Sequence, residues 1–148
     1  MFSKIVFIHL GKFKSLQYAE LFEDYYSRIK RYVKVEVKEI KISSDEKSQF
    51  EKIVPKIHDA TRNTKVVVLS ERGKSITSRE FAKFIDSGTG VLSVLTGTSW
   101  GLTEGLEKEA SLLLSFGKLT FPHEAVRFLV AEQLYRTLTI IRGESYHK

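Results

Sequence analysis

The chain contains no cysteine among its 148 residues. This absence excludes a disulfide framework and any metal site built from thiolates. It also excludes a covalent intermediate formed through a cysteine thiolate. Because disulfides belong to oxidising compartments, a chain without cysteine fits a reducing compartment, and we expect the cytoplasm.

Long apolar runs are absent as well. Residues 1–4 lead directly into a short apolar stretch. That stretch is too short for the hydrophobic region of a signal peptide or for a membrane span. We therefore expect neither a targeting segment nor a membrane anchor.

Nucleotide-binding and metal-binding motifs are also missing. The sequence has no Walker A loop, and no Gly-x-Gly-x-x-Gly pattern follows the first apolar run. The histidines lack the close spacing that is typical of metal ligands. They are His9, His58, His123 and His147. We predict no metal site.

The length and the charge are the informative parts of the composition. The length suits a single domain, residues 1–148, with a hydrophobic core of its own. Lysine and arginine exceed the acids by six. Such an excess favours a phosphate-bearing partner through counterion release, and nucleic acid is the partner we expect. The alternative is that the charge serves only solubility.

Short apolar runs alternate along the chain with segments of helical spacing. Strand patterns cover residues 4–10, 33–42, 65–69, 91–95 and part of 112–119. Helical patterns cover residues 15–30, 50–57, 77–86, 103–111 and 124–142. This alternation predicts an α/β fold with a mainly parallel sheet and flanking helices.

Two of the predicted helices carry clear local signals. Thr77 and Glu80 have the spacing of a capping box at the start of one helix. Ser43 to Asp45 offers an N-cap before the segment at 50–57. Pro55 interrupts that segment, so either a kinked helix or two short helices are expected there.

Three loops are expected at the carboxyl ends of the parallel strands, where α/β folds place ligand sites. They cover residues 69–73, 96–101 and 116–121. Gly97 and Gly101 permit the main chain to approach a ligand closely. Main-chain groups there can bind an adenine edge and a ribose between apolar walls. The alternative is that the glycines only form turns.

The predicted helix at residues 124–142 is apolar around most of its circumference. Such a helix is buried on two sides, either within one chain or partly against a second subunit. Glu132 and Arg136 are four residues apart and can pair on one face. Arg127 lies elsewhere around the helix and is a candidate for an RNA phosphate contact.

The last third of the chain carries the most specific motifs. They are Leu-Ser-Phe-Gly-Lys-Leu-Thr-Phe-Pro-His, which ends at His123, Val-Ala-Glu-Gln-Leu-Tyr-Arg at 130–136 and Gly-Glu-Ser-Tyr-His-Lys at 143–148. This stretch resembles the ribosomal large-subunit RNA pseudouridine N3-methyltransferases of the SPOUT class, and residues 6–12 and 66–73 also fit. The resemblance implies a C-terminal trefoil knot, S-adenosylmethionine as methyl donor, and a homodimer with the helix 124–142 at its interface.

The resemblance also implies a cofactor site formed mostly by main chain. Its members are Leu69, Gly97, Gly101, Phe116, Gly117, Lys118, Leu119, Thr120 and Phe121. The chain departs from the family's Gly-Gly-x-x-Gly pattern at one point. Thr98 replaces the second glycine, and Trp100 precedes Gly101. Thr98 is expected either to narrow the wall of the site or to add a hydroxyl contact.

The candidate catalytic residues are His123, Arg136, Tyr146 and His147. By the resemblance, the tail at 143–148 belongs to the active site, in its own chain or across the dimer interface. Tyr146 is expected to stack on or hydrogen-bond the target base, and His147 to accept or relay its proton. The alternative for the tail is fraying. The alternative for the chain is a non-catalytic RNA-binding module of the same fold.

Overall fold

The computed structural model describes residues 1–43 and 48–148. A five-stranded sheet lies at its centre, in the order β2-β1-β4-β3-β5, and every neighbouring pair of strands is parallel. The strands are β1 (Lys4–Leu10), β2 (Lys34–Ile40), β3 (Lys65–Ser75), β4 (Val91–Leu95) and β5 (Leu112–Ser115). The predicted α/β fold with a parallel sheet is confirmed.

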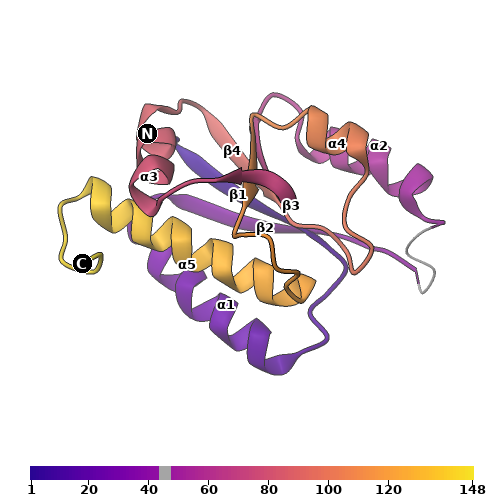
Figure 1. The fold of residues 1–148 in the computed structure, drawn as a ribbon, viewed down its shortest axis with the longest axis horizontal. Helices are drawn as coiled ribbons and strands as arrows, with labels where there is room; N and C mark the ends of the chain where they lie inside the picture. Colours follow the sequence, from indigo (N-terminus) through magenta and orange to yellow (C-terminus); the bar gives the residue numbers. More distant parts are fainter. Residues whose placement is uncertain (44–47) are drawn as a thin grey trace.

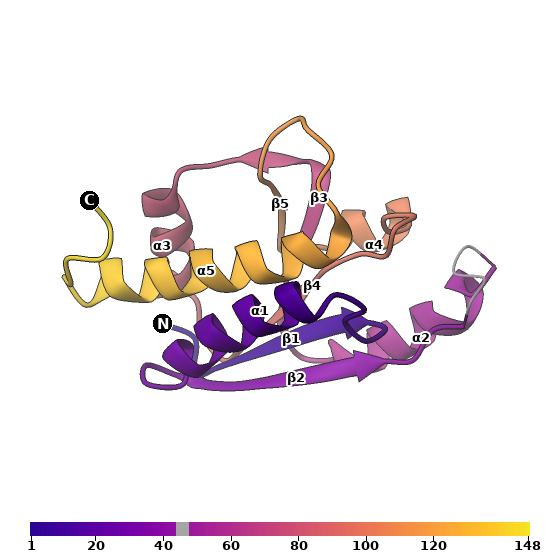
Figure 2. The ribbon, with the colours of Figure 1, turned by 90° about the horizontal axis from the view of Figure 1, so that it is seen from below.

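Helices cover both faces of the sheet (Figures 1 and 2). One face carries α1 (Leu16–Ile29), α3 (Ser78–Ser87) and α5 (His123–Ile141), and the other carries α2 (Phe50–Ala60) and α4 (Glu104–Lys108). Each face of the sheet has its own hydrophobic core. Because side chains alternate along a strand, Phe7 of β1 packs into the core beneath α1, α3 and α5, and Ile8 packs into the core beneath α2 and α4. Within the described residues, no helix has the length and apolarity needed to cross a membrane.

The helix starts follow the local signals only in part. The capping box of Thr77 and Glu80 is present at the start of α3 and is confirmed. Pro55 lies inside α2, which runs as one helix from Phe50 with Gln49 at its N-cap. The predicted cap at Ser44 and Asp45 lies outside the described residues.

Strand β3 is longer than the sequence predicts. We expected a loop at residues 70–73, but the strand continues to Ser75 with a register shift between Leu69 and Lys74. Both halves pair with β5, because Leu114 lies opposite Leu69 and again opposite Lys74. A side chain at Gly73 would place its Cβ 2.6 Å from the carbonyl oxygen of Leu113. The close approach of β5 therefore extends β3 and requires glycine at position 73.

Helix α5 packs against its own sheet and lies between α1 and α3 (Figure 2). Val130, Ala131 and Leu134 are completely buried within the chain. Burial in the chain's own core therefore accounts for one apolar side of the helix. Leu129 and Ile140, on the opposite side of the helix, are only half-buried.

Arg127 is not an RNA contact, and the prediction for this residue was wrong. Its side chain is 0% exposed, because it points from α5 into the core rather than to solvent. The guanidinium donates hydrogen bonds to the carbonyl oxygens of Leu10 (2.7 Å) and Gly11 (3.1 Å) and lies 5.0 Å from the ring centre of Phe13. It ties the start of α5 to the end of β1.

Beside Arg127, strand β1 buries an imidazole in an aromatic cage. His9 is 2% exposed and lies edge-on to the rings of Phe13 and Phe22. Its Nε2 has no hydrogen-bond partner among the described residues. Burial, and then the positive charge of Arg127, lower the pKa of His9 to about 3. The folded chain therefore holds this imidazole neutral.

We predict that His9 makes folding sensitive to mild acid. Below a pH of about 6.5 the unfolded chain binds a proton at this imidazole that the folded chain rejects, so stability falls as the pH drops towards the folded pKa. Between pH 7 and pH 5, the wild type should lose about 2 kcal/mol more of its free energy of unfolding than His9→Phe loses. Urea unfolding at the two pH values measures this, and equal losses would contradict the assignment.

Candidate functional site

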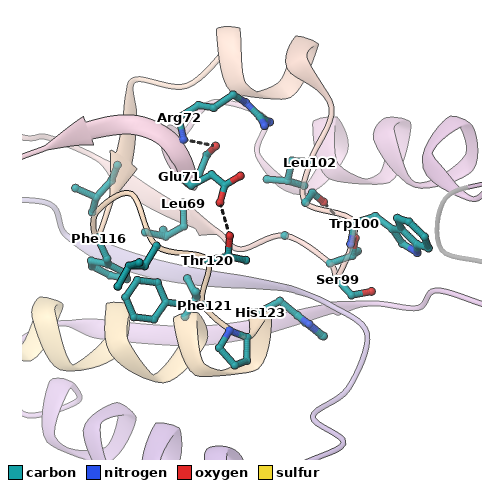
Figure 3. A pocket seen from close by; sticks show the side chains of 18 of the residues that line it. Leu69, Glu71, Arg72, Ser99, Trp100, Leu102, Phe116, Thr120, Phe121 and His123 are labelled. Carbon is teal, nitrogen blue, oxygen red and sulfur yellow. Dashed lines mark hydrogen bonds between the residues drawn. The ribbon is translucent and has the colours of Figure 1, made fainter.

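A cavity of about 460 Å³ opens at the carboxyl ends of β3, β4 and β5 (Figure 3). Its walls come from the second half of β3, from residues 97–102 after β4 and from residues 116–123 after β5. These segments meet because parallel strands all end at the same edge of a sheet. Leu114 of β5, Glu107 of α4 and Val126 of α5 complete the lining. The expected meeting of the three segments is confirmed.

The structure brings nearly all of the predicted cofactor residues to this cavity. The lining includes Leu69, Gly97, Gly101, Phe116, Gly117, Leu119, Thr120 and Phe121. Lys118 does not line the cavity, and its side chain is exposed on the rim. His123, a predicted catalytic residue, lines the cavity at the start of α5. That these residues bind a cofactor stays a prediction.

The segment after β4 is a tight turn held by Thr98. The Thr98 hydroxyl donates to the carbonyl oxygen of Gly101 (3.2 Å) and accepts from the amide of Trp100 (3.1 Å). The main chains of Thr98 and Gly101 also exchange two hydrogen bonds. Gly101 adopts a φ of 77°, which glycine permits. The hydroxyl of Thr98, at the position of the family's second glycine, therefore stabilises the turn.

Two carboxylates in the wall have fixed partners. Glu107 is buried, and its oxygens accept hydrogen bonds from Arg72 Nε (3.0 Å), Arg72 Nη2 and the hydroxyl of Ser70 (2.8 Å). Glu71 accepts from the hydroxyl of Thr120 (3.0 Å; Figure 3). These contacts tie the second half of β3 to α4 and to the segment after β5, so they connect the walls of the cavity.

The sequence did not point to Arg72 and Glu107 as partners. They lie 35 positions apart, so no helical or strand period connects them. Glu107 looks like an ordinary surface residue of a short charged helix. Only the folding of α4 against the extended β3 brings the two together, and that extension was itself missed.

A second polar group lies at the other end of α5. The hydroxyl of Tyr146 donates to Glu132 (2.9 Å) and lies 3.3 Å from the hydroxyl of Tyr25. Arg136 pairs with Glu132, as predicted, lies 4.8 Å from the ring centre of Tyr146, and has its Nη1 3.3 Å from His147 Nδ1. The tail is therefore folded back onto the helix rather than frayed.

The environment of Tyr146 decides what its phenol can do. Burial raises the pKa of Tyr146 above its ordinary value, and the hydrogen bonds with Tyr25 and Glu132 raise it further. The phenol therefore stays protonated near neutral pH and acts as a hydrogen-bond donor.

The two polar groups are far apart within one chain. Helix α5 begins at His123 in the cavity wall, and Arg136, against which the tail folds, lies about 20 Å further along the helix axis. The structure thus places His123 in the cavity and leaves Arg136, Tyr146 and His147 outside it. No cluster of three or more potential metal ligands occurs in the part of the chain that the structure describes.

The parallel sheet and the cavity at its carboxyl edge define an α/β protein with a cavity walled by three chain segments. Residues 3–147 match the family described as "Predicted SPOUT methyltransferase", and the chain belongs to this family. Its fold is accordingly the α/β knot of that family, with the trefoil in the C-terminal part. The family is one of methyltransferase enzymes.

Curated relatives and solved structures agree with this family. The chain is 38% identical to "Ribosomal RNA large subunit methyltransferase H" of Caldicellulosiruptor saccharolyticus, over 95% of this chain and 97% of that protein. A relative of the same name from Coprothermobacter proteolyticus is 36% identical over 98% and 99%. A probable methyltransferase of Bordetella pertussis matches in fold, with a TM-score of 0.55 and 15% identity over 91% and 93%. A probable methylase family protein of Haemophilus influenzae gives 0.57 and 17%, over 95% and 66%.

We predict that the Arg72–Glu107 pair stabilises the cavity wall. A double-mutant cycle with Arg72→Ala and Glu107→Gln, measured by urea unfolding, should give a coupling free energy of about 1–2 kcal/mol, because the carboxylate of Glu107 is buried. Lys108 and Glu104 of α4 form a matched control pair with both partners exposed. Their coupling should be at most about 0.5 kcal/mol. Equal couplings for the two pairs would contradict the prediction.

Proposed function

We propose that the chain is an S-adenosylmethionine-dependent methyltransferase that modifies N3 of a pseudouridine in large-subunit ribosomal RNA. The cavity at the carboxyl edge of the sheet carries this proposal, because the residues that resemble the family's cofactor site line it together. The curated relatives, which match over nearly the whole chain, are named as large-subunit ribosomal RNA methyltransferases. The excess of six positive charges suits an RNA partner.

The cavity fits S-adenosylmethionine in size and chemistry. Its volume of about 460 Å³ lies within the usual range for small-molecule sites. Leu69, Leu114 and Val126 offer apolar walls for a flat base, and the segments at 97–101 and 116–121 offer main-chain donors and acceptors. When bound, this cofactor supplies a methyl group that is already activated on a sulfonium. The protein then has to align the acceptor and manage one proton.

The acceptor decides which proton that is. N3 of pseudouridine is an imide nitrogen between two carbonyl groups, so its proton must leave as the new N–CH₃ bond forms. His123 lines the cavity and is one candidate to accept the proton. His147 of the tail is the other, held by Arg136 in the free chain. Tyr146 is better suited to donate a hydrogen bond to a carbonyl oxygen of the base.

In a homodimer, the tail of one copy can reach the cavity of the other copy. Since His147 lies against Arg136, about 20 Å along α5 from His123, it can serve the cavity only from a second copy. The half-buried side of α5, with Leu129 and Ile140, offers the contact. In this arrangement each tail completes the partner's site. We treat residues 1–148 as one methyltransferase domain, because one sheet unites the described strands, and we place the enzyme in the cytoplasm.

We predict that Gly97→Val abolishes cofactor binding while the fold is retained. A Cβ at position 97 would lie 3.0 Å from the carbonyl carbon and oxygen of Gly101, so the turn must open. The affinity for S-adenosylmethionine in calorimetry should fall at least ~10-fold. Gly105→Val is the control, because nothing lies within 4 Å of its Cβ position. A wild type that binds RNA but no S-adenosylmethionine would instead support the non-catalytic module.

We predict that deleting Tyr146 to Lys148 abolishes methyl transfer and leaves the cofactor affinity near wild type. The truncated protein keeps its cavity, since the tail lies at the far end of α5. Mixing it with Gly97→Val should restore activity to about a quarter of the wild type, because half of the dimers are hybrids with one complete site. Single-turnover methylation of large ribosomal subunits measures this. Full activity of the truncated protein alone would remove the tail from the site, and an inactive mixture would refute exchange across the dimer.

A further inference from the structure

Glu71 brings a negative charge into the wall of the cavity. It lies on the second half of β3, and Figure 3 shows its carboxylate directed towards Thr120, on the segment that follows β5. Oε2 accepts a hydrogen bond from the hydroxyl of Thr120 (3.0 Å). Oε1 has no hydrogen-bond or ion-pair partner among residues 1–43 and 48–148. This carboxylate therefore keeps binding capacity that the described chain does not use.

The other two charges in the wall neutralise each other. Arg72 is the one lysine or arginine among the described lining residues, and it binds both carboxylate oxygens of the buried Glu107. The pKa of Arg72 is raised first by its hydrogen bonds and charge contact with Glu107, and only to a smaller extent by Glu71. The described wall is thus left with one carboxylate that is not paired with a cation.

The sign of this charge is informative because the chain as a whole is basic, with six more cations than acids. A carboxylate repels phosphate groups and attracts cations, so Glu71 favours a cationic ligand in the cavity over a nucleotide phosphate. S-adenosylmethionine is such a ligand, since its sulfonium and its ammonium together outweigh its single carboxylate. Loss of the methyl group leaves S-adenosylhomocysteine, whose thioether is uncharged and whose net charge is zero.

We propose that Glu71 makes the cavity prefer the charged methyl donor to its neutral product. The proposal rests on the proposed function. During transfer the bond between sulfur and the methyl carbon breaks and its electron pair stays on sulfur. N3 of the pseudouridine gives up its proton to the base and supplies the pair for the new N–CH₃ bond. The sulfonium charge that Glu71 attracts is then gone, so the product is held less tightly and a new donor replaces it.

An attraction of this kind acts on binding rather than on the chemical step. The positive charge on sulfur decreases towards the transition state, so the carboxylate stabilises the bound donor at least as much as the transition state. Glu71→Gln should therefore raise KM for S-adenosylmethionine without lowering kcat. A lower kcat at unchanged KM would contradict a role in binding the donor.

Calorimetry with both ligands separates the charge of Glu71 from its structural contact. Glu71→Gln removes the charge but keeps an oxygen that can accept the hydrogen bond from Thr120. The preference for S-adenosylmethionine over S-adenosylhomocysteine, which is the ratio of their Kd values, should fall about 5-fold, as expected for an exposed charge pair. An equal loss of affinity for both ligands would overturn the proposal, because the carboxylate would then bind the ammonium that they share.

Thr120→Val is the matched control. It removes the hydrogen bond to Glu71 and leaves the carboxylate in place. The preference between the two ligands should stay at the wild-type value, even if the two affinities change together. A fall in preference as large as that of Glu71→Gln would show that the contact matters and not the charge, and would overturn the proposal.

Salt provides a second test, because Glu71 is exposed and its charge can be screened. When the KCl concentration rises from about 50 mM to about 500 mM, the preference for S-adenosylmethionine should fall more in the wild type than in Glu71→Gln. A wild type whose preference is no more sensitive to salt than that of the variant would overturn the proposal.

The outcomes separate this proposal from the proposed function. If the wild type methylates large ribosomal subunits and Glu71→Gln keeps the wild-type preference, the enzyme stands and the role of Glu71 fails. If the preference falls as expected but no ribosomal RNA is methylated, the role of Glu71 stands and the proposed reaction fails. A wild type that binds neither ligand would overturn both.

Discussion

The buried contact between Arg127 and the end of β1 fixes where the site lies. Its guanidinium spans from α5 to the carbonyl oxygens of Leu10 and Gly11 without reaching solvent. One turn earlier on α5, Glu124 accepts hydrogen bonds from the amides of Lys14 and Ser15. Together they lock the first turn of α5 against the sheet edge. His123 and Val126 come from the same turn, so these contacts also position the part of the cavity wall that α5 provides.

The other walls depend on the pairing of β3 with β5. A register shift lets β5 pair with both halves of β3, and the missing side chain of Gly73 lets the two backbones approach. The extended strand carries Glu71 and Arg72 to partners on two different walls. Polar contacts thus connect the segments that wall the cavity, while Leu69, Leu114 and Val126 add apolar side chains to its lining. This division suits a ligand that is recognised by its shape and by main-chain hydrogen bonds.

Helix α5 separates two kinds of chemistry. One end faces the cavity with His123, and the other holds a network of Arg136, Tyr146 and His147. A rigid helix cannot bring its two ends together, so any joint action of the two groups requires another copy of the chain. The same helix buries Val130 and Leu134 in its own core and leaves Leu129 and Ile140 half-buried.

The sequence by itself determined the order of strands and helices, the capping box of Thr77, and the three segments that meet at the carboxyl edge. These features depend on residues close in sequence or on the rule that parallel strands end together. The tertiary structure alone decided that β3 extends to Ser75, that Arg127 is buried, and that Arg72 meets Glu107. The reason is distance along the chain: Arg127 binds a carbonyl 117 positions away, and Arg72 meets a carboxylate 35 positions away. No local pattern encodes such partners, because only the packing of α5 and α4 brings them within reach.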